Sequence, residues 1–456
     1  MTIKTINPAT ETLIKKYPLL TVAQLSARIE SAHLTAEVWK TASFTQRADC
    51  MRKLAGLMRE SKKELAVLMA HEMGKPVTQG QAEIEKCALV CAHYADHASQ
   101  YLEPRIIQTE FKKTKVCYRP LGVIFGIMPW NFPFWQVFRF AAPTVMAGNA
   151  IIVKHAPITM GCGEKIEALF LAAGFPEHLF QHLVLDNALA ATAIAHEKIA
   201  AVTLTGSGRA GASVAAVAGA YLKKTVLELG GNDPYIVLED ADLALAAECI
   251  VKSRLANCGQ VCIAAKRIIA VKSIEEALVT QIKALMANYV MGNPLSEETN
   301  LGPLARKDLR EVLHQQVQAS CIAGAQLLLG GKIPSGTGFY YPPTLLTGVR
   351  KGMPAFDEEL FGPVIALISA EDEADAIALA NQSPYGLGAV VFTRDLAKGE
   401  RIAQDSLDAG LCFVNAFVVS DPRVPFGGIK QSGYGRELSR EGILEFVNTK
   451  TVAINA

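Results

Sequence analysis

The chain reads Ala201-Val202-Thr203-Leu204-Thr205-Gly206-Ser207-Gly208-Arg209-Ala210-Gly211 near the middle of its length. The first five residues predict a buried strand, and a helical pattern begins at Ala210. Between them the glycines form the pattern Gly-x-Gly-x-x-Gly. Glycines in this context let the backbone approach a pyrophosphate, and the helix N-terminus favours its negative charge. The stretch therefore predicts a dinucleotide site that includes Gly206 and Gly211.

Strands and helices alternate on both sides of this stretch. The pattern predicts strands at 121–128, 150–154, 182–185 and 224–228, with helices at 134–147, 160–173, 188–196 and 210–222. It restarts after residue 262, with strands expected near 267–271, 326–329, 364–368, 388–392 and 410–414. Apolar strands separated by helices are typical of a parallel sheet covered on both faces. We therefore expect an α/β fold with two such units.

The N-terminal part of the chain differs from the rest. Its periodicity predicts helices that begin after Thr21, and others at 45–72 and 79–100. Residues 102–120 then alternate charged and apolar side chains, which predicts an exposed hairpin. Exposed strands usually need a partner.

Composition excludes several classes of function. The 456 residues carry a net charge of +1 without a basic block, so no nucleic-acid partner is expected. None of the ten cysteines forms a Cys-x-x-Cys pair, and no His cluster completes a metal site. Free thiols in a reducing cytoplasm are the simplest interpretation. Small molecules or other copies of the chain are the expected partners.

Two segments bear on targeting and membranes. The N-terminus lacks the apolar region of a signal peptide. The apolar segment 120–154 is long enough to span a bilayer, but it is interrupted by Pro129, Asn131, Pro133 and Gln136. A buried strand, loop and helix fits this segment better than a membrane span.

Cys262 is the candidate nucleophile. It lies in Asn257-Cys258-Gly259-Gln260-Val261-Cys262-Ile263-Ala264-Ala265-Lys266-Arg267, between a polar turn and a predicted strand. Backbone N–H groups at such a junction can activate a thiolate and keep it within reach of a substrate. The alternative is a small, inert, buried cysteine.

Glu228 and Asn131 are candidate partners of this thiol. Glu228 ends an apolar strand before a Gly-Gly turn, where partial burial would raise its pKa toward the range of a general base. A conventional Rossmann interpretation instead makes it the ribose-binding carboxylate, and an ion-paired structural Glu is a third alternative. Asn131 lies between Pro129 and Pro133 and could donate to an oxyanion, or merely satisfy the loop backbone.

Taken together, these motifs resemble the NAD(P)-dependent aldehyde dehydrogenase superfamily from about Asn7 to the C-terminus. They stand in the family's order, and Cys262 follows Glu228 by the family's 34 residues. The short chain and the motif Gly-Gln-Val-Cys-Ile-Ala-Ala-Lys-Arg are most similar to the short bacterial succinate-semialdehyde dehydrogenases. A non-catalytic paralogue is the competing class, and retention of Cys262, Glu228 and Asn131 argues against it.

The resemblance implies a mechanism. The Cys262 thiolate would attack the aldehyde, with the oxyanion held by the Asn131 amide and the Cys262 N–H. Hydride transfer to the nicotinamide would leave a thioester, which water activated by Glu228 would hydrolyse.

The resemblance also implies the cofactor contacts. Ser207 is expected on the pyrophosphate, Lys154 on the adenosine ribose and Glu359 on the nicotinamide ribose, with Phe361 and Trp130 against the cofactor. Many NAD-preferring members carry Glu three residues after the ribose-binding Lys. Pro157 stands there in this chain, so both NAD and NADP remain open.

Substrate contacts follow from the same comparison. Arg139, eight residues after Asn131, and Ser420 are expected on the far carboxylate, with Phe426 in the adjoining loop. The family's second carboxylate-binding Arg is Ala256 here, and Arg254 is a possible substitute. Succinate semialdehyde is therefore the expected substrate, and glutarate semialdehyde or an aliphatic aldehyde is the alternative.

The chain is expected to divide into domains and to assemble with other copies. The resemblance implies a cofactor domain at 1–101 and 121–228, a catalytic domain at 229–445, and a β bridging element at 102–120 and 446–456. That element implies a homodimer or a homotetramer. Cys258 precedes Cys262 by four residues, and a disulfide between them is left open.

Overall fold

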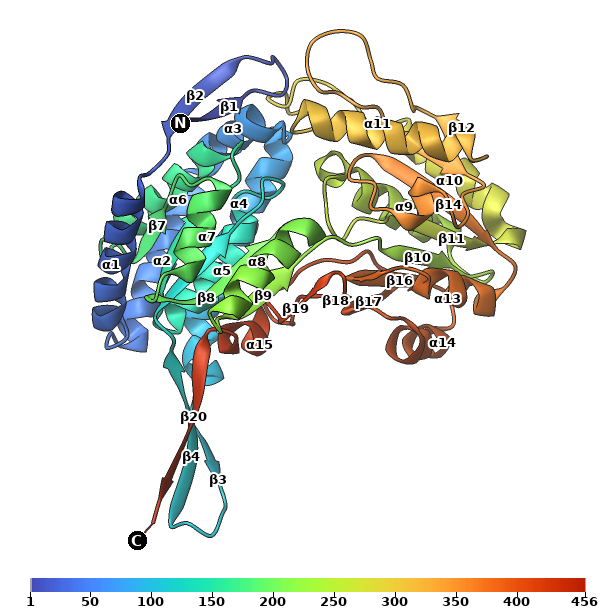
Figure 1. Cartoon of the computed structure of the whole chain (residues 1–456). Helices are drawn as coiled ribbons and strands as arrows, with labels where there is room; N and C mark the ends of the chain where they lie inside the picture. The colour runs from blue at the N-terminus through green and yellow to red at the C-terminus, as the bar shows by residue number, and fades with distance from the viewer. Residues whose placement is uncertain (1, 456) are drawn as a thin grey trace.

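The computed structural model describes residues 2–455, which form two lobes and a long projecting arm (Figure 1). Each lobe contains one large sheet, so the predicted α/β organisation with two units is confirmed. Helices cover the strands of both sheets, as expected for buried parallel strands.

The first sheet has six strands in the order β19-β9-β8-β5-β6-β7. Five strands are parallel, and β19, from the C-terminal part of the chain, joins β9 in antiparallel orientation. The bounds are β5 (Val123–Ile127), β6 (Ala150–Lys154), β7 (Phe180–His182), β8 (Ile199–Thr205), β9 (Lys224–Glu228) and β19 (Gly433–Tyr434). The strand predicted at 182–185 thus lies two residues earlier, where 180–182 pair with β6.

Helices from the first half of the chain pack around this sheet and each other. They are α1 (Val22–Trp39), α2 (Phe44–Glu60), α3 (Lys62–Met73), α4 (Val77–Tyr101), α5 (Trp135–Met146), α6 (Met160–Ala172), α7 (Asn187–Ala195) and α8 (Gly208–Ala220). Thr21 caps α1 as predicted and completes a capping box with Gln24.

Two features of this region were predicted wrongly. The single helix expected at 45–72 is two helices, because Ser61 leaves the helical conformation between α2 and α3. The strands β1 (Thr2–Ile6) and β2 (Leu13–Pro18) form an N-terminal hairpin that the sequence did not indicate. Most side chains of β2 are exposed, so its sequence carries no burial pattern.

The second sheet has seven strands in the order β12-β13-β14-β11-β10-β16-β17, all parallel except for the β12–β13 pair. The bounds are β10 (Pro234–Val237), β11 (Arg267–Val271), β12 (Gln326–Leu329), β13 (Thr344–Thr347), β14 (Val364–Ala370), β16 (Gly388–Phe392) and β17 (Leu411–Val414). Each predicted strand is present, whereas β10 and β13, of four residues each, were not predicted.

Further helices and a short strand pair surround the second sheet (Figure 1). They are α9 (Leu243–Leu255), α10 (Glu275–Met286), α11 (Lys307–Ile322), α12 (Pro354–Asp357), α13 (Glu373–Asn381), α14 (Leu396–Arg401) and the paired strands β15 (Tyr385–Gly386) and β18 (Ile429–Lys430). The helix α15 (Ser439–Leu444) instead packs against α4 and α5 in the first lobe.

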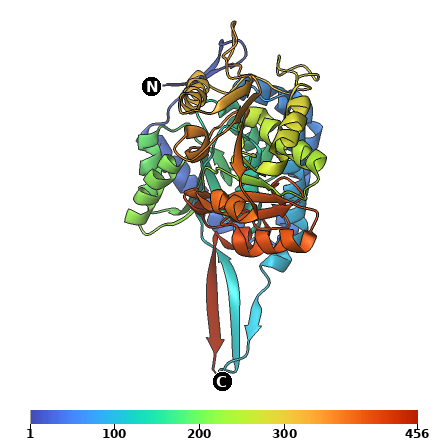
Figure 2. The same cartoon turned by 90° about the vertical axis from the view of Figure 1, so that its right-hand side faces the viewer.

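The arm is an antiparallel sheet of β3 (Arg105–Ile107), β4 (Lys113–Pro120) and β20 (Val447–Ile454). It projects away from both lobes in two perpendicular views (Figures 1 and 2). The exposed hairpin predicted at 102–120 is therefore confirmed, and the C-terminal strand pairs with it over eight residues.

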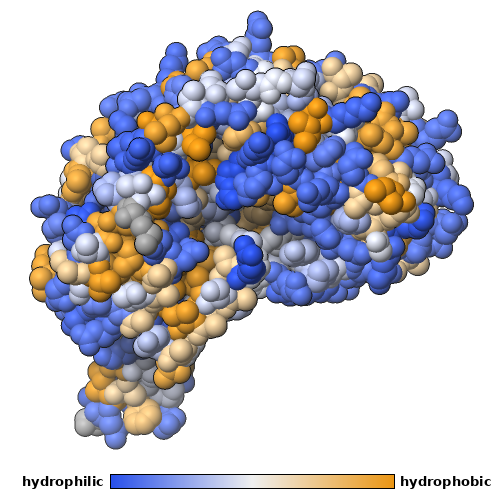
Figure 3. All heavy atoms as spheres, turned by 45° about the horizontal axis from the view of Figure 1, so that its top comes forward, coloured by the Kyte–Doolittle hydropathy of each residue, from blue (hydrophilic) through white to orange (hydrophobic). Residues whose placement is uncertain are grey.

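On the face drawn in Figure 3, polar side chains cover much of the surface, with groups of apolar side chains between them. Among residues 2–455, no helix is both long and apolar enough to cross a bilayer. The segment 120–154 instead forms β4's last residue, β5, a loop, α5 and β6, and most of its side chains are buried.

Candidate active site

The turn before Cys262 holds an unusual backbone conformation. Asn257, Cys258 and Gly259 have φ values of 48°, 56° and 74°, a left-handed region that side chains disfavour. A Cβ atom on Gly259 would lie 2.1 Å from the carbonyl oxygen of Gly362. Only glycine therefore fits at this position, and the turn carries the chain from the end of α9 to Cys262.

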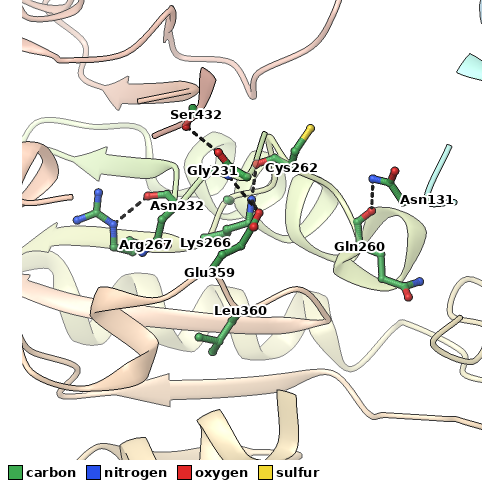
Figure 4. A network of polar contacts seen from close by, with 12 residues as sticks. Asn131, Gly231, Asn232, Gln260, Cys262, Lys266, Arg267, Glu359, Leu360 and Ser432 are labelled. Atoms are coloured by element: carbon green, nitrogen blue, oxygen red, sulfur yellow. Dashed lines mark hydrogen bonds and ion pairs between the residues drawn. The ribbon is translucent and has the colours of Figure 1, made fainter. Parts of the chain in front are cut away.

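Asn131 and the cysteine turn are joined by hydrogen bonds (Figure 4). The Asn131 amide donates to the Gln260 carbonyl at 3.0 Å, and the Asn257 amide donates to the Asn131 carbonyl at 2.8 Å. A carboxamide has two N–H donors, so Asn131 keeps a second one beyond its bond to Gln260. The structure thus brings Asn131 to the loop of Cys262.

Lys266 anchors the other side of the cysteine. Its ammonium donates to the Cys262 carbonyl and pairs with the Glu359 carboxylate at 3.1 Å. Glu359 also accepts from the Gly231 N–H at 3.2 Å. The sulfur of Cys262 points away from the Lys266–Glu359 pair (Figure 4), so these contacts fix the backbone and leave the thiol available.

The electrostatic environment of the thiol is mixed. Burial raises the pKa of Cys262 to about 11, while the positive charges of Arg139 and Lys266 act in the opposite direction. Burial is the larger influence, so the pKa of the Cys262 thiol lies above its ordinary value.

Cys262 lies on the wall of a cavity of about 670 Å³. Arg139, Ser420 and Phe426, the three residues predicted to bind substrate, line the same cavity. Its remaining charged wall residues come from α3–α4 and α9, namely Lys75, Glu83, Lys86 and Lys252. A volume of this size suits a small organic molecule.

Arg139 is already engaged by protein groups. It forms a buried ion pair with Glu437, and one guanidinium N–H lies 3.4 Å from the Thr205 hydroxyl. The guanidinium also lies 4.4 Å from the ring centroid of Phe426. Much of its charge is thus balanced before any ligand arrives.

Glu228 lies at the end of β9 and is only 2% exposed. Neither carboxylate oxygen has a hydrogen-bond partner among the described residues. Burial raises the pKa of this carboxyl well above its usual range, and Arg139 nearby offsets only part of that effect. A buried carboxyl without partners is costly and marks a candidate general base.

A second cavity, of about 380 Å³, lies at the N-terminal end of α8. Lys154, Ser207 and Arg209 line it, and Glu228 does not. Ser207 caps α8 by accepting from the Ala210 N–H, and a Cβ on Gly211 would lie 2.7 Å from the Leu229 side chain. Gly206 donates its N–H to the Glu228 carbonyl, so the glycine-rich turn packs tightly between strand and helix.

The rings of Trp130 and Phe361 meet edge to face, with centroids 5.7 Å apart. Two residues from distant parts of the sequence, both predicted to contact a cofactor, are thus neighbours.

One open alternative, Arg254 as a second carboxylate-binding residue, is excluded by its position. Arg254 is fully buried and donates to the carbonyls of Val364 and Leu360, so it does not reach the cavity of Cys262. Cys258 and Cys262 are both free thiols, and Cys258 donates to the Gly302 carbonyl at 3.2 Å.

Sequence reasoning missed Lys86, Glu437 and the anchoring role of Lys266. Lys266 belongs to the cysteine motif, so its spacing could have indicated a link to that loop. No sequence signal connects Lys86 in α4 with Ser420, because the tertiary fold alone joins them. Within residues 2–455, no three His, Cys, Asp or Glu side chains gather as a metal site.

The whole chain is similar to known proteins. A probable succinate-semialdehyde dehydrogenase (NADP+) of Synechocystis sp. is 45% identical over 454 residues and matches 100% of both chains. The succinate semialdehyde dehydrogenase (NAD(P)+) Sad of Escherichia coli K12 is 45% identical, over 98% of this chain and 96% of its own. The solved structure of succinic semialdehyde dehydrogenase from Streptococcus pyogenes with NADP+ superposes with a TM-score of 0.97 at 34% identity, over all of both chains.

The family model agrees with these relatives. The Aldehyde dehydrogenase family model matches residues 1–452, which includes both lobes and most of the arm. The resemblance seen in the motifs therefore extends over the entire fold, and the chain belongs to the aldehyde dehydrogenase family.

Proposed function

We propose that this protein oxidises succinate semialdehyde to succinate with NAD(P) as hydride acceptor. The observation that carries the proposal is the position of Cys262, a thiol on the wall of a cavity that is also lined by the cationic side chains of Arg139 and Lys86. Family membership supports the reaction class, and the names of the relatives support the substrate and the cofactor.

The chain's own residues suit the steps on the substrate. The Cys262 thiolate adds to the aldehyde carbon and forms a tetrahedral oxyanion, to which the second N–H of Asn131 and the Cys262 N–H can donate. Loss of hydride converts this adduct into a thioester. Glu228 then takes a proton from water, the hydroxide attacks the thioester carbon, and the carboxylic acid leaves with the thiolate restored.

The cavity beside α8 fits a dinucleotide. It lies at a helix N-terminus, its turn is rich in glycine, and its wall carries the cations Lys154 and Arg209 without a carboxylate. When bound, the dinucleotide supplies the hydride acceptor. Because no lining carboxylate would repel a 2′-phosphate and Pro157 replaces the usual Glu, the residues present suit NADP as well as NAD.

We also propose a domain organisation, an assembly and a cellular environment for the chain. We assign residues 1–101 and 121–228 to cofactor binding, 229–445 to catalysis, and 102–120 with 446–456 to assembly as a homo-oligomer. The ten cysteines are free, which suits a reducing cytoplasm.

A substrate comparison tests the proposal. The purified protein is assayed with succinate semialdehyde and with butanal, which keeps the chain length but lacks the carboxylate, each with NADP and NAD. We expect kcat/KM at least tenfold higher for the semialdehyde, and no reduced dinucleotide from C262A. Equal efficiency on both aldehydes would contradict the proposed substrate, and activity in C262A would contradict the proposed nucleophile.

A further inference from the structure

The cavity of Cys262 needs a cation for the far carboxylate of a semialdehyde. Arg139 is the expected one, but Glu437 already pairs with it. The position expected to carry a second Arg is Ala256, which lines the cavity without charge, and Arg254 faces elsewhere. The charge balance of the site is therefore incomplete unless another residue supplies a cation.

Lys86, in the third turn of α4, is such a residue. It lines the cavity, and its ammonium donates to the Ser420 hydroxyl at 2.6 Å. The ammonium also lies 4.3 Å from the ring centroid of Trp135, an arrangement that fixes its direction. No carboxylate within residues 2–455 forms an ion pair with it. The acid nearly one turn earlier on the helix, Glu83, is occupied by Lys75 and by the N–H groups of Phe134 and Trp135, and the adjacent Glu85 pairs with Arg59.

Burial also makes this ammonium receptive to an anion. The pKa of Lys86 is lowered to about 8, first by burial and then by the like charge of Arg139. An anion placed beside it would restore the stabilisation that burial removes.

We propose that Lys86 and Ser420 together bind the far carboxylate of the substrate, and so determine the preference for a semialdehyde. This inference rests on the proposed function and adds a specificity residue to it. The Lys86 ammonium donates to one carboxylate oxygen, and the Ser420 hydroxyl, which now accepts from Lys86, turns its own proton toward the carboxylate. Arg139 lines the same cavity and also contributes positive charge around Cys262 and Glu228.

The other lysines of the cavity are less suited. Lys75 is fully buried in its pair with Glu83. Lys252 is exposed, and its ammonium lies 5.4 Å from the centroid of the Phe417 ring, with no hydrogen-bond partner among residues 2–455. It therefore serves as a control for the general positive potential of the cavity.

The test compares wild type, K86M, K86R and K252M on succinate semialdehyde and butanal. We expect K86M to lower kcat/KM for the semialdehyde about 10-fold to 100-fold, mainly through KM, because a charged hydrogen bond is lost. Butanal oxidation by K86M should stay within about twofold of the wild-type rate. If Lys86 only supported the cavity wall, the substitution would slow butanal oxidation as well. K86R should restore most of the preference, and K252M should keep it.

Each of the other results overturns the role of Lys86, the proposed substrate, or both. A wild-type preference that K86M retains overturns the role of Lys86 and leaves the proposed function standing. Equal loss on both aldehydes in K86M also overturns it, because the lysine would then only shape the wall. Absence of any preference in wild type overturns the proposed substrate and this inference with it. If K86M does not fold, K86Q takes its place in the same comparison.

Discussion

Cys262 is subject to two opposing influences, because burial disfavours its thiolate while Arg139 and Lys266 favour it. With a pKa of about 11, the thiolate fraction of the free protein should rise about tenfold for each pH unit between 7 and 10. We expect the rate of alkylation by iodoacetamide to follow that slope. Mass spectrometry of the Cys262 peptide and loss of activity measure it, with C262S as the background.

An ordinary, exposed cysteine has a pKa near 8.5, so its rate would level off by about pH 9. A plateau of this kind at Cys262 would show that the cationic neighbours outweigh burial. The other thiols provide an internal reference, since Cys258 is buried and has a pKa raised to about 12.

At this same scale, the sequence predicted the residues that stand in compact motifs. Cys262, Glu228 and Asn131 could be assigned because each lies in a short run with its own chemistry. Glu437 and Lys86 could not, because their meaning depends on partners, Arg139 and Ser420, that only the fold brings near.

The turn at 256–259 is the element that presents the nucleophile, and Gly259 is its most constrained residue. Replacing Gly259 with Ala forces an L side chain to a φ of 74° and places Cβ 2.1 Å from the Gly362 carbonyl oxygen. We expect G259A to cost about 2 kcal/mol or more of stability and to reduce activity more than tenfold, as Cys262 shifts. Chemical denaturation and steady-state kinetics measure both.

Gly219, exposed near the end of α8, gives the matched control. No heavy atom lies within 4 Å of a Cβ built there, and its φ is not positive. G219A should leave activity unchanged and raise stability by up to about 1 kcal/mol, because alanine favours the helix. Similar effects of the two substitutions would contradict the role assigned to the turn.

Among the elements, long periodic segments were predictable and short or exposed ones were not. The strands flanking the glycine-rich turn were identified because they are buried and apolar. The break at Ser61 was missed because the apolar stripe continues through both α2 and α3. Four-residue strands such as β10 and β13 carry too little pattern to stand out and depend on pairing with distant neighbours.

In the whole molecule, residues from both lobes meet around one cavity. Lys86 comes from a helix packed with the first lobe, whereas Cys262 comes from the loop before β11 in the second. Arg139 on α5 and its partner Glu437, between β19 and α15, also belong to the first lobe. Substrate preference and bond chemistry therefore come from separate parts of the chain, which explains why a specificity residue can change without loss of the nucleophile.

The arm is the part of the molecule least explained by a single chain. Within the described part of the chain, the edge strands β3 and β20 each have an unpaired side, and the arm exposes Ile106, Phe111 and Ile454 by 58%, 42% and 46%. Unpaired edges with apolar side chains favour association with another copy. We expect sedimentation velocity to show a dimer or tetramer for wild type, and I106K/F111K to shift the distribution toward smaller species.

The variant I322K controls for the added positive charge of the lysines. Ile322 is 88% exposed on α11, away from the arm. That variant should sediment like wild type. The arm packs little against the lobes, so I106K/F111K should change the cavity of Cys262 hardly at all, and its activity per chain should stay within a fewfold. A stable wild-type monomer would contradict the role of the arm, because its exposed strands would then remain uncovered in solution.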